Sequence, residues 1–214
     1  MNENSSKQVL LSVIGIAVLV VAVVGVSFAF FTYSKAGEKN NTLTTGSIFF
    51  DFTEGNAITL TNQFPMADSV GEALTPGANG ALEFTVKGYD TSEKGIEYTI
   101  YAFPGETEGS KTRFKDSEIK LNLEAPAAVV TNNYSTSKAI DGSLTSGIVL
   151  ATGKITAKSL ATQQEDKYTL RMWISDTVTI GEGKTYTTTA FANLYYSLKL
   201  KVVAATTGTA QPTP

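Results

Sequence analysis

The chain of 214 residues contains no cysteine and no histidine. Without thiols it forms no disulfide, so an exported form must be held together by core packing or by assembly with neighbouring copies. Without imidazole, the Ser-His-Asp and Cys-His nucleophilic sites are excluded, as are the zinc sites that use histidine. The chemistries that remain are carboxylate pairs, Ser-Lys nucleophiles and calcium bound by oxygen ligands.

Other familiar signals are also missing. The sequence has neither of the glycine-rich phosphate-binding patterns GxGxxG and GxxxxGK[ST], so nothing supports a nucleotide cofactor. Its formal net charge of −3 gives no basic footprint for nucleic acid. No repeat of solenoid length is present. We therefore expect a protein that is not an enzyme, carries no cofactor and does not bind nucleic acid.

What the chain does have is a long apolar run near its start, from Val9 to Phe31. A helix of about 20 apolar residues spans the hydrocarbon core of a bilayer. The run ends in Ser27-Phe28-Ala29, the small-x-small pattern that a signal peptidase recognises. Residues 1–29 are therefore predicted to be a signal peptide, with Ser27 and Ala29 at the cleavage site and Phe30 as the first mature residue.

A retained membrane anchor is the alternative, because the apolar run is longer than the usual signal-peptide core of about 7–15 residues. Residues 9–31 would then hold the protein in the membrane. Both interpretations predict an exported protein, outside the cell or on its surface.

The remainder of the chain shows the alternation of apolar and polar residues that is typical of β-strands. Such strands have one buried and one solvated face, as in antiparallel sheets. Glycine- and proline-containing turns separate them, for example Thr75-Pro76-Gly77. The strands predicted in this way centre on residues 48–52, 82–86, 96–102, 119–123, 168–174 and 198–202.

These signals predict one all-β domain over residues 42–205, built as a sandwich or barrel. A linker at residues 30–41 precedes it, and a Thr- and Pro-rich tail at residues 206–214 follows. Short helices are expected only around residues 113–117 or 132–138.

The aromatic residues Phe30, Phe31 and Tyr33 lie between the export segment and this domain. An extended apolar peptide is an aggregation hazard unless it is paired. Three placements remain open: the segment pairs with its own domain, adds a strand to a neighbouring copy, or lies at the membrane surface if the anchor is retained.

Possible site residues elsewhere favour ordinary roles. Asp51, Glu54 and Asp68 lack the spacing of an EF-hand calcium loop and are expected to be solvated carboxylates. Glu106 and Glu108 occupy a predicted acidic turn. Trp173 falls on the polar side of its strand, where it would cover an edge, fill a second packed layer or form a subunit contact.

Two stretches resemble the start of TasA/camelysin-type proteins: Gly25-Val-Ser-Phe-Ala-Phe-Phe-Thr-Tyr-Ser34 and Asn40-Asn-Thr-Leu-Thr-Thr-Gly-Ser-Ile48. Leu74-Thr-Pro-Gly77, before the predicted strand at 82–86, is similar to the family's turn, although Ala78 replaces the acidic residue that follows it there. Residues 168–174 and 196–202 resemble strands of related surface proteins.

The resemblance implies an antiparallel, jelly-roll-like β-sandwich that follows an N-terminal signal or transmembrane helix. It also implies a structural subunit of an extracellular or cell-surface filament, such as a biofilm matrix fibre. Copies would assemble into a homopolymer through an N-terminal strand that contains Phe30, Phe31 and Tyr33. The metalloprotease activity described for camelysins is not expected, because no histidine is present to hold zinc. The alternative is a membrane-anchored surface or virion envelope protein that binds a partner or ligand.

Overall fold

The computed structural model describes residues 33–36, 43–45, 48–53, 58–61, 63–77, 80–91, 94–127 and 131–208, and gives the backbone alone up to residue 53. These described residues, all from Tyr33 onward, belong to one compact unit. The apolar segment at residues 9–31 lies outside the described residues. Within them, no helix is both long and apolar enough to cross a membrane.

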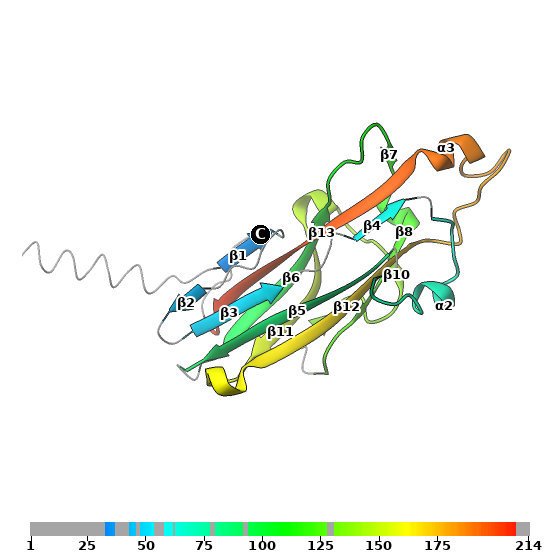
Figure 1. Ribbon diagram of the computed structural model, residues 1–214. Coiled ribbons are helices and arrows are strands. Elements are labelled where there is room, and N and C mark those ends of the chain that lie inside the picture. The colour runs from blue at the N-terminus through cyan, green and yellow to red at the C-terminus, as the bar shows by residue number, and fades with distance from the viewer. Residues whose placement is uncertain are drawn as a thin grey trace, which may run out of the picture. The chain divides into compact units, whose positions relative to one another are not determined.

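The described strands form two sheets, which confirms the all-β, mainly antiparallel fold (Figure 1). The first, here called the β13 sheet, contains in spatial order β1 (Tyr33–Ala36), β13 (Leu194–Thr206), β6 (Ile96–Pro104), β11 (Ile148–Ile155) and β9 (Thr131–Asn132). Two further short strands also pair with β13, namely β4 (Ile58–Thr61) and β7 (Thr112–Arg113).

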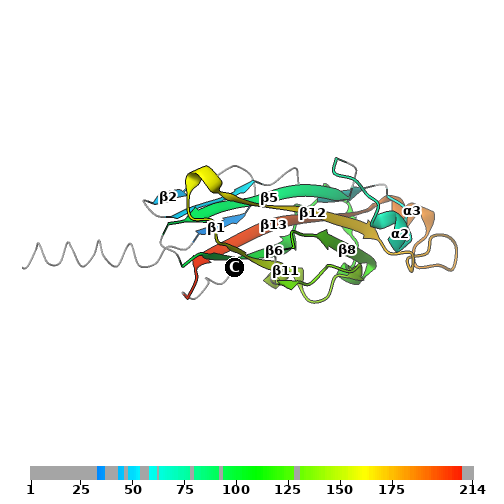
Figure 2. The same cartoon turned by 90° about the horizontal axis from the view of Figure 1, so that it is seen from below.

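The second sheet, here called the β12 sheet, contains in spatial order β10 (Lys138–Ala139), β8 (Ile119–Glu124), β12 (Gln164–Ile174), β5 (Ala81–Asp90), β3 (Ile48–Thr53) and β2 (Leu43–Thr45). Figure 2 shows β5 and β12 in one layer and β13, β6 and β11 in the other. The long strands β5, β6, β8, β11, β12 and β13 alternate between the two sheets along the chain.

The core lies between the sheets and consists of the apolar residues that alternate along each strand. On β12 the inward side chains of Tyr168, Leu170 and Met172 are at most 1% exposed. Their neighbours Thr169 and Arg171 are only half-buried. Burying a large apolar side chain contributes about 1.5–3 kcal/mol, so this alternation fixes which face of each strand turns inward.

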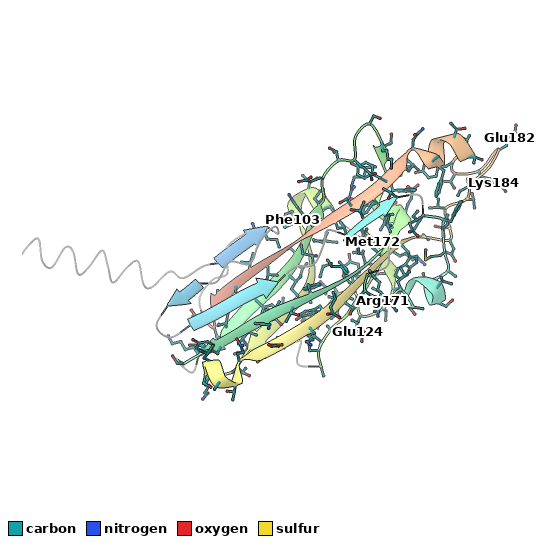
Figure 3. The ribbon with its side chains drawn as sticks, in the orientation of Figure 1. Phe103, Glu124, Arg171, Met172, Glu182 and Lys184 are labelled. Atoms are coloured by element: carbon teal, nitrogen blue, oxygen red, sulfur yellow. The ribbon has the colours of Figure 1, made fainter. Side chains whose placement is uncertain are left out.

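Charged residues cover the outward face of the β12 sheet. Arg171 and Glu124 lie side by side there, with Nη2 and Oε2 2.9 Å apart (Figure 3). Lys87 and Glu165 form a second pair at 2.8 Å, and this contact lowers the pKa of the Glu165 carboxyl. Exposed pairs of this kind contribute little to stability, so the face is mainly a solvated surface.

Trp173 belongs to this outward face and is nonetheless fully buried. The short helix α2 (Asp68–Gly71) covers it so closely that a Cβ atom on Gly71 would overlap the indole ring. Beside this contact, the Lys120 ammonium binds both carboxylate oxygens of Asp68 at 2.7 and 2.9 Å. Of the three roles expected for Trp173, the structure shows the second packed layer.

The remaining helices are short. Helix α3 (Thr188–Ala192) begins after Thr187, whose hydroxyl accepts a hydrogen bond from the backbone N–H of Ala190. Single 3-10 turns occur at Asp116–Glu118, Leu144–Ser146 and Leu160–Thr162. The first overlaps the helix expected at 113–117, whereas the helix expected at 132–138 is wrong, because a turn joins β9 to β10 there.

Candidate functional site

The candidate site is the outer edge of β13, where the first described strand of the chain pairs. The predicted cleavage residues Ser27, Ala29 and Phe30 lie outside the described residues, as does Phe31. Tyr33, the third residue of the predicted assembly segment, begins β1.

β1 pairs antiparallel with β13 of the same chain. The register places Tyr33 opposite Ala204, and Ala36 opposite Lys201. On the other side of β13, the same stretch pairs with β6, because Lys201 is also opposite Tyr101 and Ala204 opposite Tyr98. β1 therefore forms the border of the sheet along this part of β13.

β4 lies on the same edge of β13, further toward its start. Leu198 is opposite Ile58 of β4 and also opposite Pro104 of β6, so β4 and β6 must flank β13 on different sides. β4 and β1 both run antiparallel to β13 and therefore follow one another along one border. Two short strands thus close the edge of one long strand.

The inward-facing residues of β13 become smaller along this edge, from the start of the strand toward its end. The inward residues of β13 run from Tyr196 and Leu198 through Leu200 and Val202 to Ala204, and each is at most 4% exposed. β4 places Ile58 and Leu60 opposite the two residues at the start of this series, and both are buried. β1 places Tyr33 and Lys35 at the register positions opposite Ala204 and Val202. The smallest inward residue of β13 therefore lies opposite Tyr33.

A buried polar network stands next to Ala204 on the far side from β1. The Tyr98 hydroxyl donates to Asp166 Oδ2 at 2.5 Å and lies 2.6 Å from the Tyr168 hydroxyl. Because a tyrosine hydroxyl has a single proton, Tyr168 donates to Tyr98. The Gln164 amide donates to both oxygens of Asp166, at 3.0 and 2.9 Å. The network joins β6 of one sheet to β12 of the other.

Burial is the main cause of the titration behaviour of these tyrosines. It raises the pKa of Tyr98 far above the ordinary value, and the nearby Tyr168 and Asp166 raise it further. The pKa of Tyr168 is also raised by burial, although the Tyr98 hydroxyl partly opposes this. Both hydroxyls therefore stay protonated and act as hydrogen-bond donors.

The opposite border of the β13 sheet, along β11, is closed differently. Among the described residues, β9 pairs with two residues of β11, Ala151 and Thr152. On one side of β9, the Asn133 side-chain amide donates to the backbone carbonyl of Val149 at 2.9 Å.

On the other side of β9, the Gln164 amide acts as a substitute strand. It donates to the carbonyl of Lys154 at 2.9 Å, and its oxygen accepts from the backbone N–H of Thr156 at 2.9 Å. Side-chain amides within the folded domain thus seal this border, which is one way in which proteins protect an edge from pairing with other chains.

The candidate carboxylates do not come together among the described side chains. Asp68 pairs with Lys120, and Glu108 pairs with Lys111 at 2.9 Å. The side chains of Asp51 and Glu54 lie outside the described part. Where side chains are described, no group of three or more His, Cys, Asp or Glu residues is placed to hold a metal ion.

Sequence reasoning missed the acceptor side of this site, Ala204 and the edge of β13 on which it lies. It also missed the network around Asp166, for which a signal exists. Asp166 is two and four residues before the core residues Tyr168 and Leu170, so on a strand its side chain faces the same, buried side. A buried carboxylate is expected to be hydrogen-bonded. No protein-family model, curated protein or solved structure matches the chain.

Proposed function

We propose that the protein is a structural subunit of an extracellular or cell-surface filament, in which copies exchange their N-terminal strands. The observation that carries this proposal is the pairing of β1, the first described strand, along the border of β13. A strand near one end of a chain can leave its sheet and enter the same place in a second copy without unfolding the rest.

The proposal includes a jelly-roll topology for the domain. One sheet contains the run β4-β13-β6-β11 and the other the run β5-β12-β8-β10, with β3 and β2 continuing beyond β5 and with successive long strands in opposite sheets. This order supports a jelly roll in which β4 and β1 share the position of one border strand. β4 occupies this border over the first part of β13, and β1 occupies it over a later part. β1 therefore forms only part of the border, which suits an element that is exchanged between copies.

The contrast between the two borders of the β13 sheet also supports the proposal. Amide side chains bind backbone carbonyls of β11 at Val149 and Lys154, so fewer groups remain there for a strand from another copy to pair with. The β13 border is completed by backbone pairing with β1. An extended segment from a neighbour can make the same backbone hydrogen bonds, which is the basis of β-augmentation.

Exchange would not require new chemistry. The same ladder forms in the closed monomer and in the polymer, so it contributes nearly equally to both states. Contacts made only between subunits, set against the loss of translational and rotational freedom, then decide the balance. The aromatic segment at residues 30–33 and the predicted cleavage after Ala29 are consistent with a strand that is released before assembly.

A cysteine cross-link tests the exchange, because the chain has no cysteine of its own. Ala36 and Lys201 are directly opposite, and Cα atoms so placed in antiparallel strands are about 4.5–5.5 Å apart, within the range for a disulfide. When exported Ala36→Cys and Lys201→Cys variants are mixed, allowed to assemble and oxidised, we expect a disulfide-linked heterodimer within filaments seen by electron microscopy. Ser34→Cys mixed with Lys201→Cys is the control, since these positions are out of register.

Filaments that form without the Ala36–Lys201 cross-link would rule out strand exchange along β13. A protein that forms no filaments under any condition, and retains Met1 on the cell surface, would instead favour the anchored surface or envelope protein.

A further inference from the structure

We propose that a polar hollow, where the chain passes from β10 to β11, is a binding site for an uncharged, hydroxyl-rich ligand such as a short saccharide. The hollow has a volume of about 380 Å³, within the range of about 300–1,000 Å³ that is typical of small-molecule sites. It lies at the border that contains β10 and β11, whereas β1 pairs along the edge of β13. The inference is therefore independent of strand exchange and concerns a further function.

The walls of the hollow are fixed by the fold. Tyr134, which follows β9, is 2% exposed, and its backbone carbonyl accepts a hydrogen bond from the N–H of Leu123 at 2.8 Å. Its side chain also hydrogen-bonds to the backbone of Asp141, which ties one wall to the segment that forms the other. That segment continues into the 3-10 turn anchored by Leu144, which is 1% exposed. A site formed before the ligand arrives costs little ordering on binding.

The lining carries polar groups that the fold itself does not use. Asp141, Ser143 and Ser146 are exposed, and no described residue makes a hydrogen bond or an ion pair with their side chains. The Asn133 amide donates to the carbonyl of Val149, which leaves its side-chain oxygen as an acceptor. A carboxylate, two hydroxyls and an amide oxygen thus surround one hollow, where the hydroxyl groups of a ligand can replace water.

The charges of the hollow decide the class of ligand. The Lys138 ammonium lies 4.7 Å from the centroid of the Tyr134 ring, and the Asp141 carboxylate brings the opposite charge to the same lining. A ligand of either net charge would be attracted by one group and repelled by the other. A calcium ion needs six to eight oxygen ligands, often several carboxylates, and Lys138 opposes it.

A saccharide satisfies all of these groups without a net charge. Each of its hydroxyls is both a donor and an acceptor, so neighbouring hydroxyls can donate to the two oxygens of Asp141 while others accept from Lys138 or pair with the serine hydroxyls. Hydrogen bonds to a charged group are the stronger ones, which makes Asp141 the main determinant of affinity. A free amino acid would match the two charges and leave the serine hydroxyls unused.

The test is a titration of the isotope-labelled exported chain with maltotriose, cellotriose and chitotriose, followed by the NMR shifts of the backbone amides. We expect saturable shifts confined to residues 133–149 for at least one of them. The dissociation constant should be about 0.1–10 mM, since the hollow is open and its contacts are few. Asp141→Asn should weaken binding about ten-fold or more. Glu182→Gln, at the exposed tip of the loop after β12, removes the same charge and should leave binding unchanged (Figure 3).

A second variant, Ser143→Ala combined with Ser146→Ala, should weaken binding about three- to ten-fold. Neither change removes a contact of the fold, so the midpoint of thermal unfolding should stay at the wild-type value in both variants. If Asp141→Asn does not fold, the serine variant decides. The absence of any saturable shift up to about 50 mM saccharide, saturable shifts outside residues 133–149, or equal weakening by Glu182→Gln would each overturn the inference. Saturable binding of free serine without binding of any saccharide would overturn it as well.

Filament formation is compared in the same variants. Because the hollow is not on the β13 edge, Asp141→Asn should assemble like the wild type. Saccharide binding without filaments would support this inference and contradict the proposed function. Filaments from a protein that binds none of the saccharides would overturn this inference and leave the proposed function standing.

Discussion

Replacing Tyr98 with phenylalanine tests whether its hydroxyl is the centre of the buried network between the sheets. The hydroxyl donates to Asp166 and receives the proton of Tyr168. Its removal takes one donor from a carboxylate that is 5% exposed and also leaves the Tyr168 hydroxyl without this acceptor. Asp166 would keep only the Gln164 amide among the donors that the described residues provide.

The magnitude follows from these losses. A hydrogen bond to a charged group contributes about 1.5–3 kcal/mol, and an unsatisfied buried polar group costs about 1–3 kcal/mol. We expect Tyr98→Phe to lower the free energy of unfolding by about 1.5–3 kcal/mol. Tyr168→Phe removes only a donor to Tyr98 and leaves Asp166 with both its donors, so its cost should be about 0.5–1.5 kcal/mol.

Urea unfolding of both variants, followed by circular dichroism, gives the comparison. The slope of the free energy against urea concentration should stay at the wild-type value, since the surface exposed on unfolding is unchanged. The free energy of unfolding should be lowest for Tyr98→Phe, intermediate for Tyr168→Phe and highest for the wild type. If Tyr168→Phe destabilises the protein as much as Tyr98→Phe, the assigned direction of the hydrogen bonds is wrong.

Three further predictions concern other parts of the fold. Burial, and then hydrogen bonding to Glu118, raise the pKa of Tyr186 to about 12. The contribution of Tyr186 to stability is therefore complete below the unfolded pKa of about 10 and is lost as the pH rises toward 12. A base titration followed by tyrosinate absorbance should show unfolding in that range, and unchanged stability there would contradict the prediction. Gly71→Val should displace α2 and shift the fluorescence of Trp173, the single tryptophan, to longer wavelength. Val70→Ala, at a position 55% exposed, should not shift it. Identical emission spectra for the Gly71→Val variant and the wild type would show that α2 does not cover Trp173 tightly. Gln164→Ala should open the β11 border and increase association measured by light scattering, with Gln163→Ala as the control, and a monodisperse Gln164→Ala protein would show that the amide does not protect the edge.

The all-β fold and its long regular strands could be predicted because their alternation is uninterrupted. β5 and β12 show this most clearly, since every second residue from Leu82 to Val86 and from Tyr168 to Ile174 is buried. β11 was not predicted. Its ladder with β6 shifts register between Val149 and Ala151, so the alternation breaks in the middle of the strand.

Other features depend on contacts between distant residues. Trp173 is buried because α2 folds over the outward face of the β12 sheet, and nothing in the period of its own strand indicates that cover. The partner of β1 is β13, the last described strand, and no local pattern specifies a pairing between strands so far apart in the sequence. The aromatic segment could be recognised as one that needs a partner, but the choice among the three expected placements could not be made from the sequence.

β1 and β4 border the same strand, but their different positions along the chain decide which of them can move to another copy. β4 lies between β3 and α2, so it cannot move to another copy unless the elements on both sides of it also move. β1 is the first described element, and among the described elements it is joined directly only to β2, on its C-terminal side. If the chain is cut after Ala29, three residues precede β1, and the strand can leave its border freely. If the anchor is retained, the same strand is tethered to the membrane.

On the proposed function, cleavage would therefore control assembly. An Ala29→Leu variant that blocks processing should leave β1 paired within each copy and yield anchored monomers. Filaments formed by the uncleaved protein would contradict this prediction.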